Sequence, residues 1–219
     1  MTQSFVRAEF HCHTIYSHDS LVELGALLKA CDKRGIDKIA ITDHGSMKGA
    51  FKAYKMAPDR VILGEEIRTP EGEILGYFMT EEIPQGLEAT EVVRRLQEQE
   101  AFISLPHPFD PHRSWWTDRT LDQILPSLDG IEVFNARCLR EEYNQNAYYF
   151  ALEHGKALMA GSDAHALGEL GRTYMTMPWF DDAESLRAAA REVTIGGELS
   201  GIHVHMVSTF ARFAKKISH

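Results

Sequence analysis

The hydrophobic and polar residues of the chain follow two periodic patterns, and together these patterns predict alternating strands and helices. Short apolar or alternating runs that stop at polar or turn-forming residues predict strands. The predicted strands are Phe5–His13, Lys38–Thr42, Arg60–Ile67, Glu73–Thr80, Phe102–Leu105, Gly130–Phe134, Ala157–Gly161 and Thr173–Met177. Apolar residues three and four positions apart predict helices between these strands. The predicted helices are about Val22–Arg34, Lys48–Met56, Thr90–Gln99, Leu121–Leu128, Glu141–Glu153 and Ala183–Glu192.

This order of elements favours one fold class. Short βα units that follow one another are typical of a barrel-like α/β fold, in which strands form the centre and helices the outside. The sequence contains no internal repeat, low-complexity run or linker. We therefore expect a single domain over residues 1–219, with a C-terminal helix and tail over residues 182–219. The stretch Gly201–His205 carries a second His-x-His pair, and it predicts a half-exposed strand near the C-terminus.

Composition narrows the class of protein. Of the 219 residues, 44% are hydrophobic and 25% are charged, which is ordinary for a globular protein with a sizeable core. No apolar run is long enough to span a bilayer, and the start MTQSFVRAEF lacks the apolar core of a signal peptide. The cysteines Cys12, Cys31 and Cys138 are too few and too scattered for a disulfide framework or a zinc ribbon. We therefore expect a cytoplasmic protein.

The charge of the chain limits its partners. The net charge is −9 at pH 7, so the chain as a whole repels polyanions. We expect no membrane partner and no long nucleic acid. Any phosphate group that the protein binds must be held by a local positive site.

Imidazole and carboxylate side chains follow five of the predicted strands. In a barrel of parallel strands, the C-terminal ends of the strands meet at one rim, where functional residues converge. His11 and His13 are two positions apart, so both point to one face of the first strand while Cys12 points to the other. The candidate metal ligands at this rim are His11, His13, Asp19, His44, Glu66, His107, Asp163 and His165.

The composition of this set indicates the kind of metal. Imidazole and carboxylate without thiolate suit zinc, manganese or iron rather than a closed cysteine site. Five histidines and three carboxylates exceed what one ion can use, so we expect two or three divalent ions. Paired ions about 3.5–4 Å apart commonly activate water and clamp phosphate oxygens. Such ions would make the pocket positive in an acidic protein.

The order of these residues resembles the PHP (polymerase and histidinol phosphatase) domain family. Any one of the matching segments is a weak signal, but five in the expected order are specific. The segments lie within about residues 7–178 and are His11-x-His13 with Tyr16-Ser17-x-Asp19-Ser20, Thr42-Asp43-His44-Gly45, Gly64-Glu65-Glu66, His107-Pro108 and Ser162-Asp163-x-His165. The resemblance implies a distorted (β/α)7 barrel with a multinuclear metal site.

The resemblance also implies how the ligands are divided among the ions. One ion would take His11, His13, Glu66 and Asp163. A second would take Asp19, His44 and His165, and the family spacing favours Asp19 over its neighbour His18. A third would be bridged through Glu66 to His107.

The sequence departs from the fullest family pattern at this third ion. Members with nine ligands carry an extra histidine between the Gly-x-Glu and His-Pro segments, whereas residues 67–106 contain no histidine. The Glu66/His107 position is therefore expected to be weaker, or to be completed by water, substrate or Glu73. A hairpin glutamate is more often solvated, so Glu73 is the less favoured of these.

Three functions are compatible with this site. The favoured one is a phosphoesterase in which metal-bound hydroxide attacks phosphorus and the other ions neutralise the developing charge. Its substrate would be a nucleotide, a short oligonucleotide or another small phosphate ester. The alternatives are a histidinol-phosphate phosphatase and a non-catalytic metal-binding module. The metal ligands alone would also suit an amide or lactone hydrolase, which only the family resemblance disfavours.

Residues near the same rim are candidates for substrate binding. Arg137 follows the strand Gly130–Phe134, and Arg172 follows the last ligand segment. Either guanidinium could hold phosphate oxygens bidentately, with a surface ion pair as the alternative. Asn135 ends its strand at the level of the ligands and could orient substrate or water.

The loop after His107 contains the pair Trp115-Trp116. Aromatic pairs in irregular segments usually anchor the loop by packing, so we favour packing. Stacking on a base near the mouth of the pocket is the alternative.

Overall fold

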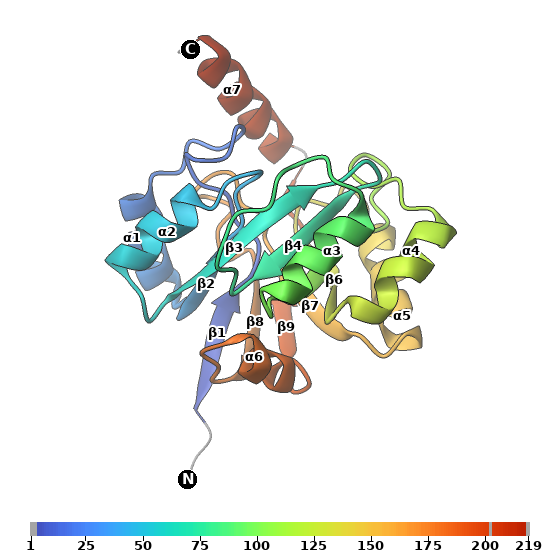
Figure 1. Cartoon of the computed structure of the whole chain (residues 1–219). Coiled ribbons are helices and arrows are strands. Elements are labelled where there is room, and N and C mark those ends of the chain that lie inside the picture. Colours follow the sequence, from blue (N-terminus) through green and yellow to red (C-terminus); the bar gives the residue numbers. More distant parts are fainter. Residues whose placement is uncertain (1–3, 202, 218–219) are drawn as a thin grey trace.

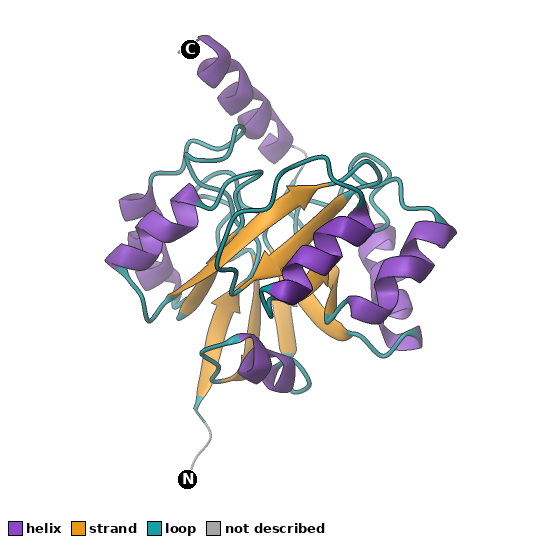
Figure 2. Ribbon diagram, in the orientation of Figure 1, coloured by secondary structure: helices purple, strands orange, loops and turns teal. Residues whose placement is uncertain are grey.

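The chain folds, in a computed structural model, into a curved sheet that is almost closed into a barrel, with helices on its outside (Figures 1 and 2). The structure describes residues 4–201 and 203–217, and within them nine strands pair in the order β7-β6-β5-β4-β3-β2-β1-β8-β9. The strands are β1 (Phe5–Glu9), β2 (Lys38–Ile41), β3 (Val61–Arg68), β4 (Glu73–Tyr77), β5 (Phe102–Leu105), β6 (Gly130–Asn135), β7 (Ala157–Gly161), β8 (Thr173–Pro178) and β9 (Thr194–Gly197). The α/β barrel expected from the sequence is confirmed.

The helices lie around this sheet, with α1 and α2 on one side and α3, α4 and α5 on the other (Figure 1). They are α1 (Leu24–Arg34), α2 (Lys48–Met56), α3 (Ala89–Glu98), α4 (Asp118–Ile124), α5 (Glu141–Glu153), α6 (Ala183–Ala189) and α7 (His203–Ile217), with a short 3-10 turn, η1 (Leu125–Ser127), after α4. The predicted end of the first helix is confirmed, because Gly35 adopts a left-handed φ of 61° and its N–H donates to Asp32.

Strand direction decides which residues reach the same rim. β1, β2 and β3 pair in parallel, and so do β5, β6 and β7. β4 is antiparallel to both β3 and β5, so the two parallel groups run the same way. The C-terminal ends of these strands therefore meet at one end of the barrel, and β4 begins there. Figure 1 shows this end on the side of α7.

The opposite half of the barrel interior is apolar. Phe10 lies with its ring centroid 5.3 Å from Tyr77 of β4 and 5.8 Å from Phe180. Tyr77 in turn lies 5.9 Å from Phe102 of β5, and Leu186 of α6 is buried in the same cluster. This packing fills the barrel below the polar rim, so the interior is a core rather than a channel.

The three cysteines behave as core residues. All three are free thiols and are buried. Cys12 packs with Leu27 and Cys31 beneath α1, on the far side of the chain from His11 and His13, as the alternation of side chains predicts.

One prediction near the C-terminus is wrong, and one strand there was not predicted. The stretch Gly201–His205 was expected to be a strand, but α7 begins at His203. The side chains of His203 and His205 lie outside the described residues. β9, which pairs antiparallel with β8, was not predicted from the sequence. Its sequence TIGG contains two glycines, which weaken the pattern of a strand.

The helix α7 stands at the rim of the barrel and projects away from it (Figure 1). Val204, Ser208 and Ala211 are buried against the body, whereas Phe210 and Phe213 are exposed. Among residues 4–201 and 203–217, no helix combines the length and the apolar character that crossing a membrane requires.

A close approach between β1 and β7 generates a prediction about stability. A Cβ atom on Gly161 would lie 2.3 Å from the Cβ of His11 and 2.8 Å from Oε1 of Glu132, so the two strands would have to separate. We expect Gly161→Ala to lower the free energy of unfolding by about 1–3 kcal/mol. Gly168→Ala is the matched control, because a Cβ added to Gly168 would meet no atom within 4 Å beyond its chain neighbours. Denaturant unfolding of the two variants tests this; equal stabilities would contradict it.

Candidate metal centre

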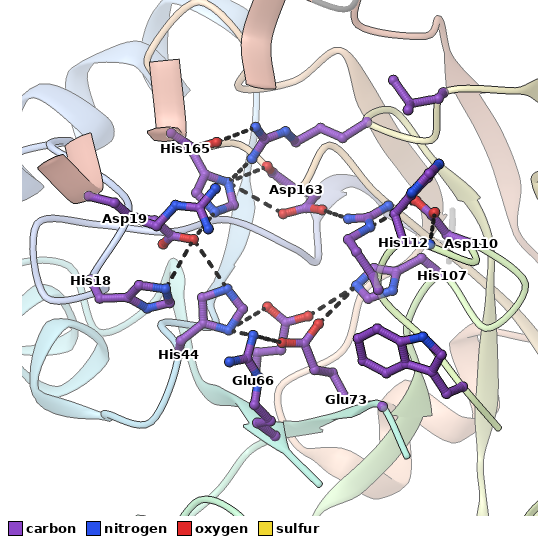
Figure 3. Close-up of a pocket in the computed structure, with 18 residues that line it drawn as sticks. His18, Asp19, His44, Glu66, Glu73, His107, Asp110, His112, Asp163 and His165 are labelled. Atoms are coloured by element: carbon purple, nitrogen blue, oxygen red, sulfur yellow. Dashed lines mark hydrogen bonds and ion pairs between the residues drawn. The ribbon is translucent and has the colours of Figure 1, made fainter. Parts of the chain in front are cut away.

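The candidate ligands gather around Glu66, a buried residue of β3. Its Oε2 lies 3.2 Å from Nε2 of His11, 3.2 Å from Nε2 of His13 and 3.2 Å from Nδ1 of His44. Its Oε1 lies 3.2 Å from Nε2 of His107. Figure 3 shows His44 and His107 on either side of this carboxylate. One carboxylate therefore faces four imidazoles from three other segments of the chain.

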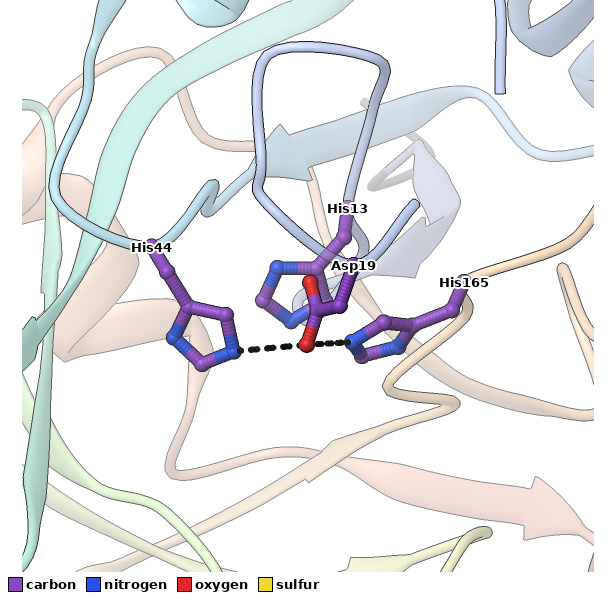
Figure 4. A group of neighbouring side chains, drawn as sticks. All are labelled: His13, Asp19, His44 and His165. Carbon is purple, nitrogen blue, oxygen red and sulfur yellow. Dashed lines mark ion pairs between the residues drawn. The ribbon is translucent and has the colours of Figure 1, made fainter. Parts of the chain in front are cut away.

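Asp19 joins a second group of imidazoles beside the first (Figure 4). Its Oδ2 lies 3.2 Å from Nε2 of His165 and 3.6 Å from Nε2 of His44. The ring of His13 lies 4.2 Å from that of His165, so His13 stands between the two groups. His44 presents Nδ1 to Glu66 and Nε2 to Asp19.

The two carboxylate oxygens of Asp163 have different neighbours. Oδ1 lies 3.3 Å from Nε2 of His13 and 3.7 Å from Nε2 of His11. Oδ2 accepts hydrogen bonds from Nη1 of Arg113 and, at 3.3 Å, from Nδ2 of Asn135. Only Oδ1 therefore faces the cluster.

The separations between these atoms fit ions held among the side chains. Zinc lies about 2.0–2.2 Å from nitrogen and oxygen ligands, so two ligands of one ion stand roughly 3.0–3.4 Å apart. His11 and His13 stand at this distance from Glu66. Yet Nε2 of both histidines and Oε2 of Glu66, all buried, make no hydrogen bond within the part of the chain that the structure describes. Buried polar atoms normally have partners, and a shared cation would satisfy all three.

Hydrogen bonds behind the ligands fix their orientation. Nδ1 of His11 lies 2.9 Å from Oε1 of Glu132, so a proton on Nδ1 leaves Nε2 free to bind a metal. Oε2 of Glu132 accepts the backbone N–H of His107 at 3.0 Å and Nδ2 of Asn135 at 2.9 Å. One buried glutamate of β6 therefore orients two ligands.

Two further carboxylates hold the loops that carry ligands. Glu9 is fully buried, and it accepts the backbone N–H of His11 at 3.1 Å and that of Ser162 at 2.9 Å. Asp43 accepts the N–H and the hydroxyl of Thr14 at 2.5 and 2.6 Å. These contacts tie the loop after β1 to the loops after β2 and β7.

The backbone is unusual at two ligands. His107 has a φ of 30° and Asp163 a φ of 52°, which are rare for residues other than glycine. Such conformations persist where the surrounding contacts impose them, and they are enriched at functional sites.

A hollow of about 370 Å³ opens above the ligands (Figure 3). Its volume is in the range of small-molecule sites. Four arginines contribute to its lining, together with the rim residues His18, His112 and Trp115. The arginines are Arg68, Arg113, Arg137 and Arg212. The lining therefore supplies guanidinium groups in a chain whose net charge is −9, beside the five carboxylates of the same lining: Asp19, Glu66, Glu73, Asp110 and Asp163.

Comparison with known proteins identifies the family. The family model of the PHP domain matches residues 9–198, which includes every candidate ligand. The chain belongs to the PHP domain family.

Relatives and solved PHP structures agree with this assignment. An uncharacterized protein of Methanocaldococcus jannaschii is 38% identical over 144 residues, which cover 60% of this chain and 82% of that protein. A two-domain protein from Bacteroides vulgatus, containing a predicted PHP-like metal-dependent phosphoesterase, has a TM-score of 0.74 at 19% identity and matches 90% of this chain and 66% of its own. The lesion-specific endonuclease PfuEndoQ from Pyrococcus furiosus has a TM-score of 0.68 at 17% identity, over 88% of this chain and 58% of its own.

The PHP fold thus brings together all eight ligands expected from the sequence, and it adds a ninth candidate. Glu73 is 5% exposed, and its carboxylate lies 3.5 Å from His44 and 3.7 Å from His107. His18 lies at the rim, 3.7 Å from Asp19, and is half exposed, in line with a neighbouring rather than a ligating role.

The residues proposed for substrate binding are placed differently. Asn135 is buried behind Asp163 and orients that ligand. Nη2 of Arg137 donates to the Val204 carbonyl at 3.1 Å and to Ser208 at 2.9 Å, and Nη1 contacts His165, so Arg137 ties α7 to a ligand. The structure does not bring Arg172 to the cluster.

Arg172 instead lies in a separate hollow and pairs with Glu198 at 3.0 Å. The two tryptophans also differ. Trp116 packs against the core, as predicted for the pair, whereas Trp115 is 64% exposed at the pocket.

Glu132 and Arg113 are not among the candidate residues that the sequence indicated. Glu132 could have been recognised in the sequence, because it is an acidic residue within the otherwise largely apolar strand GIEVFN. Arg113 lies six residues after His107 in an irregular loop, and no periodicity indicates where its side chain points.

The charges of the ligands depend on one another. Burial alone would raise the pKa of Glu66, but His11 and His44 hold that pKa well below its usual range. Burial would lower the pKa of His13, yet the negative charges of the neighbouring Asp163 and Glu66 raise it to about 10. Burial lowers the pKa of His44 to about 3. The buried imidazoles and carboxylates therefore set one another's charge.

The convergence of ligands predicts the metal content of the protein. We expect purified protein to hold at least two transition-metal ions, and His11→Ala and Asp163→Ala to hold fewer. His154→Ala is the matched control, because His154 is exposed and its ring lies 4.5 Å from that of Phe150, to which it is tilted by 59°. Elemental analysis tests this. Less than one ion in protein prepared without chelator, or equal losses in the control, would contradict it.

Acid is expected to release the ions. The raised pKa of His13 means that an ion must displace a proton at neutral pH, so protons compete more strongly as the pH falls. We expect protein dialysed at about pH 5 to retain fewer ions than protein dialysed at about pH 7.5, because ordinary imidazoles are also protonated in acid. Metal content that is independent of pH over this range would contradict the assignment of imidazole ligands.

Proposed function

We propose that the chain is a metal-dependent phosphoesterase that hydrolyses a small phosphate ester with metal-activated water. The observation that carries this proposal is the buried cluster of imidazoles and carboxylates around Glu66, at the floor of a hollow lined by arginines. The Bacteroides vulgatus protein, which shares the fold, contains a predicted metal-dependent phosphoesterase.

The proposed ligands follow the groups in the structure. His11, His13 and Asp163 would hold one ion, and Asp19, His44 and His165 a second, with Glu66 bridging toward His107. Divalent ions at such positions lower the pKa of water and stabilise negative charge on phosphate oxygens. Glu132 would orient the ligand His11, and the burial of the ligand side chains would limit their contact with bulk solvent.

Arginines at the hollow would bind the phosphate. Arg113 is the favoured residue, because its side chain is 21% exposed toward the hollow while its guanidinium contacts Asp163. A planar guanidinium fits phosphate oxygens bidentately. The exposed Arg68 and Arg212 would attract the substrate at the mouth. Arg137 is proposed to position His165 and α7 instead.

A nucleotide or short oligonucleotide is the proposed substrate class. The exposed indole of Trp115 lies at the same hollow as the arginines, and a base can stack on an exposed indole. PfuEndoQ, which shares the fold, is a lesion-specific endonuclease. The local arginines, rather than the net charge, are what a phosphate would meet at this site.

A screen of phosphate esters tests the proposal. Protein loaded with Mn²⁺ is offered nucleotides, short oligonucleotides, sugar phosphates and histidinol phosphate, and released phosphate or cleaved product is measured. We expect turnover of at least one nucleotide or oligonucleotide by wild type and none by Asp163→Ala. Fully metallated protein that turns over none of these compounds would favour a non-catalytic module. Turnover of histidinol phosphate alone would favour the biosynthetic phosphatase.

Replacement of Arg113 tests how phosphate is held. We expect Arg113→Ala to lower kcat/KM by roughly ten- to a hundredfold, because a charge-assisted hydrogen bond contributes about 1.5–3 kcal/mol. Arg113→Lys should recover only part of this loss, since lysine keeps the charge but not the planar fork. Arg172→Ala is the matched control and should keep the wild-type value. If Arg113→Ala loses metal in proportion to activity, Arg113 serves only to hold Asp163.

A further inference from the structure

Glu73 reaches the rim from a strand that runs opposite to its neighbours. β4 pairs antiparallel with β3, with Glu73 opposite Arg68 and Leu75 opposite Glu66. The first residue of β4 therefore stands beside the end of β3. Glu73 is only 5% exposed, and Figure 3 shows its carboxylate next to that of Glu66.

The contacts of Glu73 point into the cluster. Oε2 lies 3.7 Å from Nε2 of His107, and Oε1 lies 3.5 Å from Nδ1 of His44. Oε1 also accepts a hydrogen bond from Nη2 of Arg68 at 3.4 Å. Oε1 of Glu66, which is 1% exposed, lies 3.2 Å from the same Nε2 of His107. Two buried carboxylates thus converge where a cation would satisfy both.

We infer that Glu73 is a metal ligand, and that it forms with Glu66 and His107 an ion position richer in oxygen than the others. The inference rests on the proposed function only in that the cluster holds ions. His11 and His13 stand with Asp163, and His13, His44 and His165 with Asp19, so each of those positions has at least two imidazoles. The position at Glu73 has one. No histidine occurs in residues 67–106, so this carboxylate is the side chain that the sequence supplies there.

The difference in ligands gives this position a different metal preference. Carboxylate oxygens suit harder ions such as Mn²⁺ and Mg²⁺, whereas imidazoles suit zinc and iron. Zinc binds most sites more tightly than manganese, so the metal preference of each position is expressed as a ratio of its two affinities. The ratio of Zn²⁺ affinity to Mn²⁺ affinity is lowest at the position of Glu73.

The number of bound ions tests the role of Glu73. Wild type, Glu73→Gln and Glu71→Gln are stripped of metal and saturated with Mn²⁺, and the ions retained after gel filtration are counted. We expect Glu73→Gln to bind one equivalent fewer than wild type. Glu71→Gln, from the same turn, should bind the wild-type number, because its carboxylate contacts Thr69 and not the cluster. Equal Mn²⁺ content in Glu73→Gln and wild type would overturn the inference, as would the loss of every ion.

The variant Glu73→His tests the preference. With an imidazole in place of the carboxylate, the ratio of Zn²⁺ affinity to Mn²⁺ affinity at this ion position should rise at least tenfold. Competition between the two ions measures this ratio. An unchanged ratio would overturn the inferred preference. These readouts are metal content and affinity, so they remain valid if the wild-type protein hydrolyses no phosphate ester. Wild-type protein that binds the expected ions but hydrolyses no phosphate ester would overturn the proposed function alone.

Discussion

The burial of Glu66 is the constraint on which the rest of the rim depends. A carboxylate with 1% exposure is stable as an anion only if nearby positive charge compensates for its lost hydration. Its oxygens lie 3.2 Å from four imidazoles, and those imidazoles come from the loops after β1, β2 and β5. To place them around one carboxylate, the sheet must curve until these strands surround β3. The geometry of the cluster therefore requires the near-closure of the barrel.

The residues behind the ligands make this arrangement rigid. Glu132 orients His11 and the backbone of His107, while Glu9 connects the segments that carry His11 and Asp163. These carboxylates are buried, and each depends on several donors at once. Loss of one donor would leave a buried acceptor without a partner, which is destabilising. The apolar half of the barrel, from Phe10 to Leu186, supplies the core on which the polar half rests.

The sequence predicted those parts of the site that depend on strand direction alone. Histidine and acidic residues at the ends of apolar runs had to meet at one rim once the strands were parallel, and the eight expected ligands do meet there. Glu73 was underestimated because β4 is antiparallel, so its first residue reaches the rim where other strands end. Glu132 and Arg113 depend on tertiary contacts that no local period records. Arg172 follows a ligand closely in sequence, but the chain turns away at Gly171, whose φ is 68°. A strand was expected at Gly201–His205, but α7 begins at His203, because short apolar runs do not distinguish the two conformations.

Asp163 also limits how the cluster can be coordinated. Arg113 and Asn135 occupy its Oδ2, so the carboxylate can offer an ion only Oδ1 and must act as a monodentate ligand. A chelating carboxylate would take two places in the coordination sphere of that ion. A contact through one oxygen would leave one of those places to another donor. The contact of Arg113 with Asp163, made outside the cluster, would thereby limit the coordination within it.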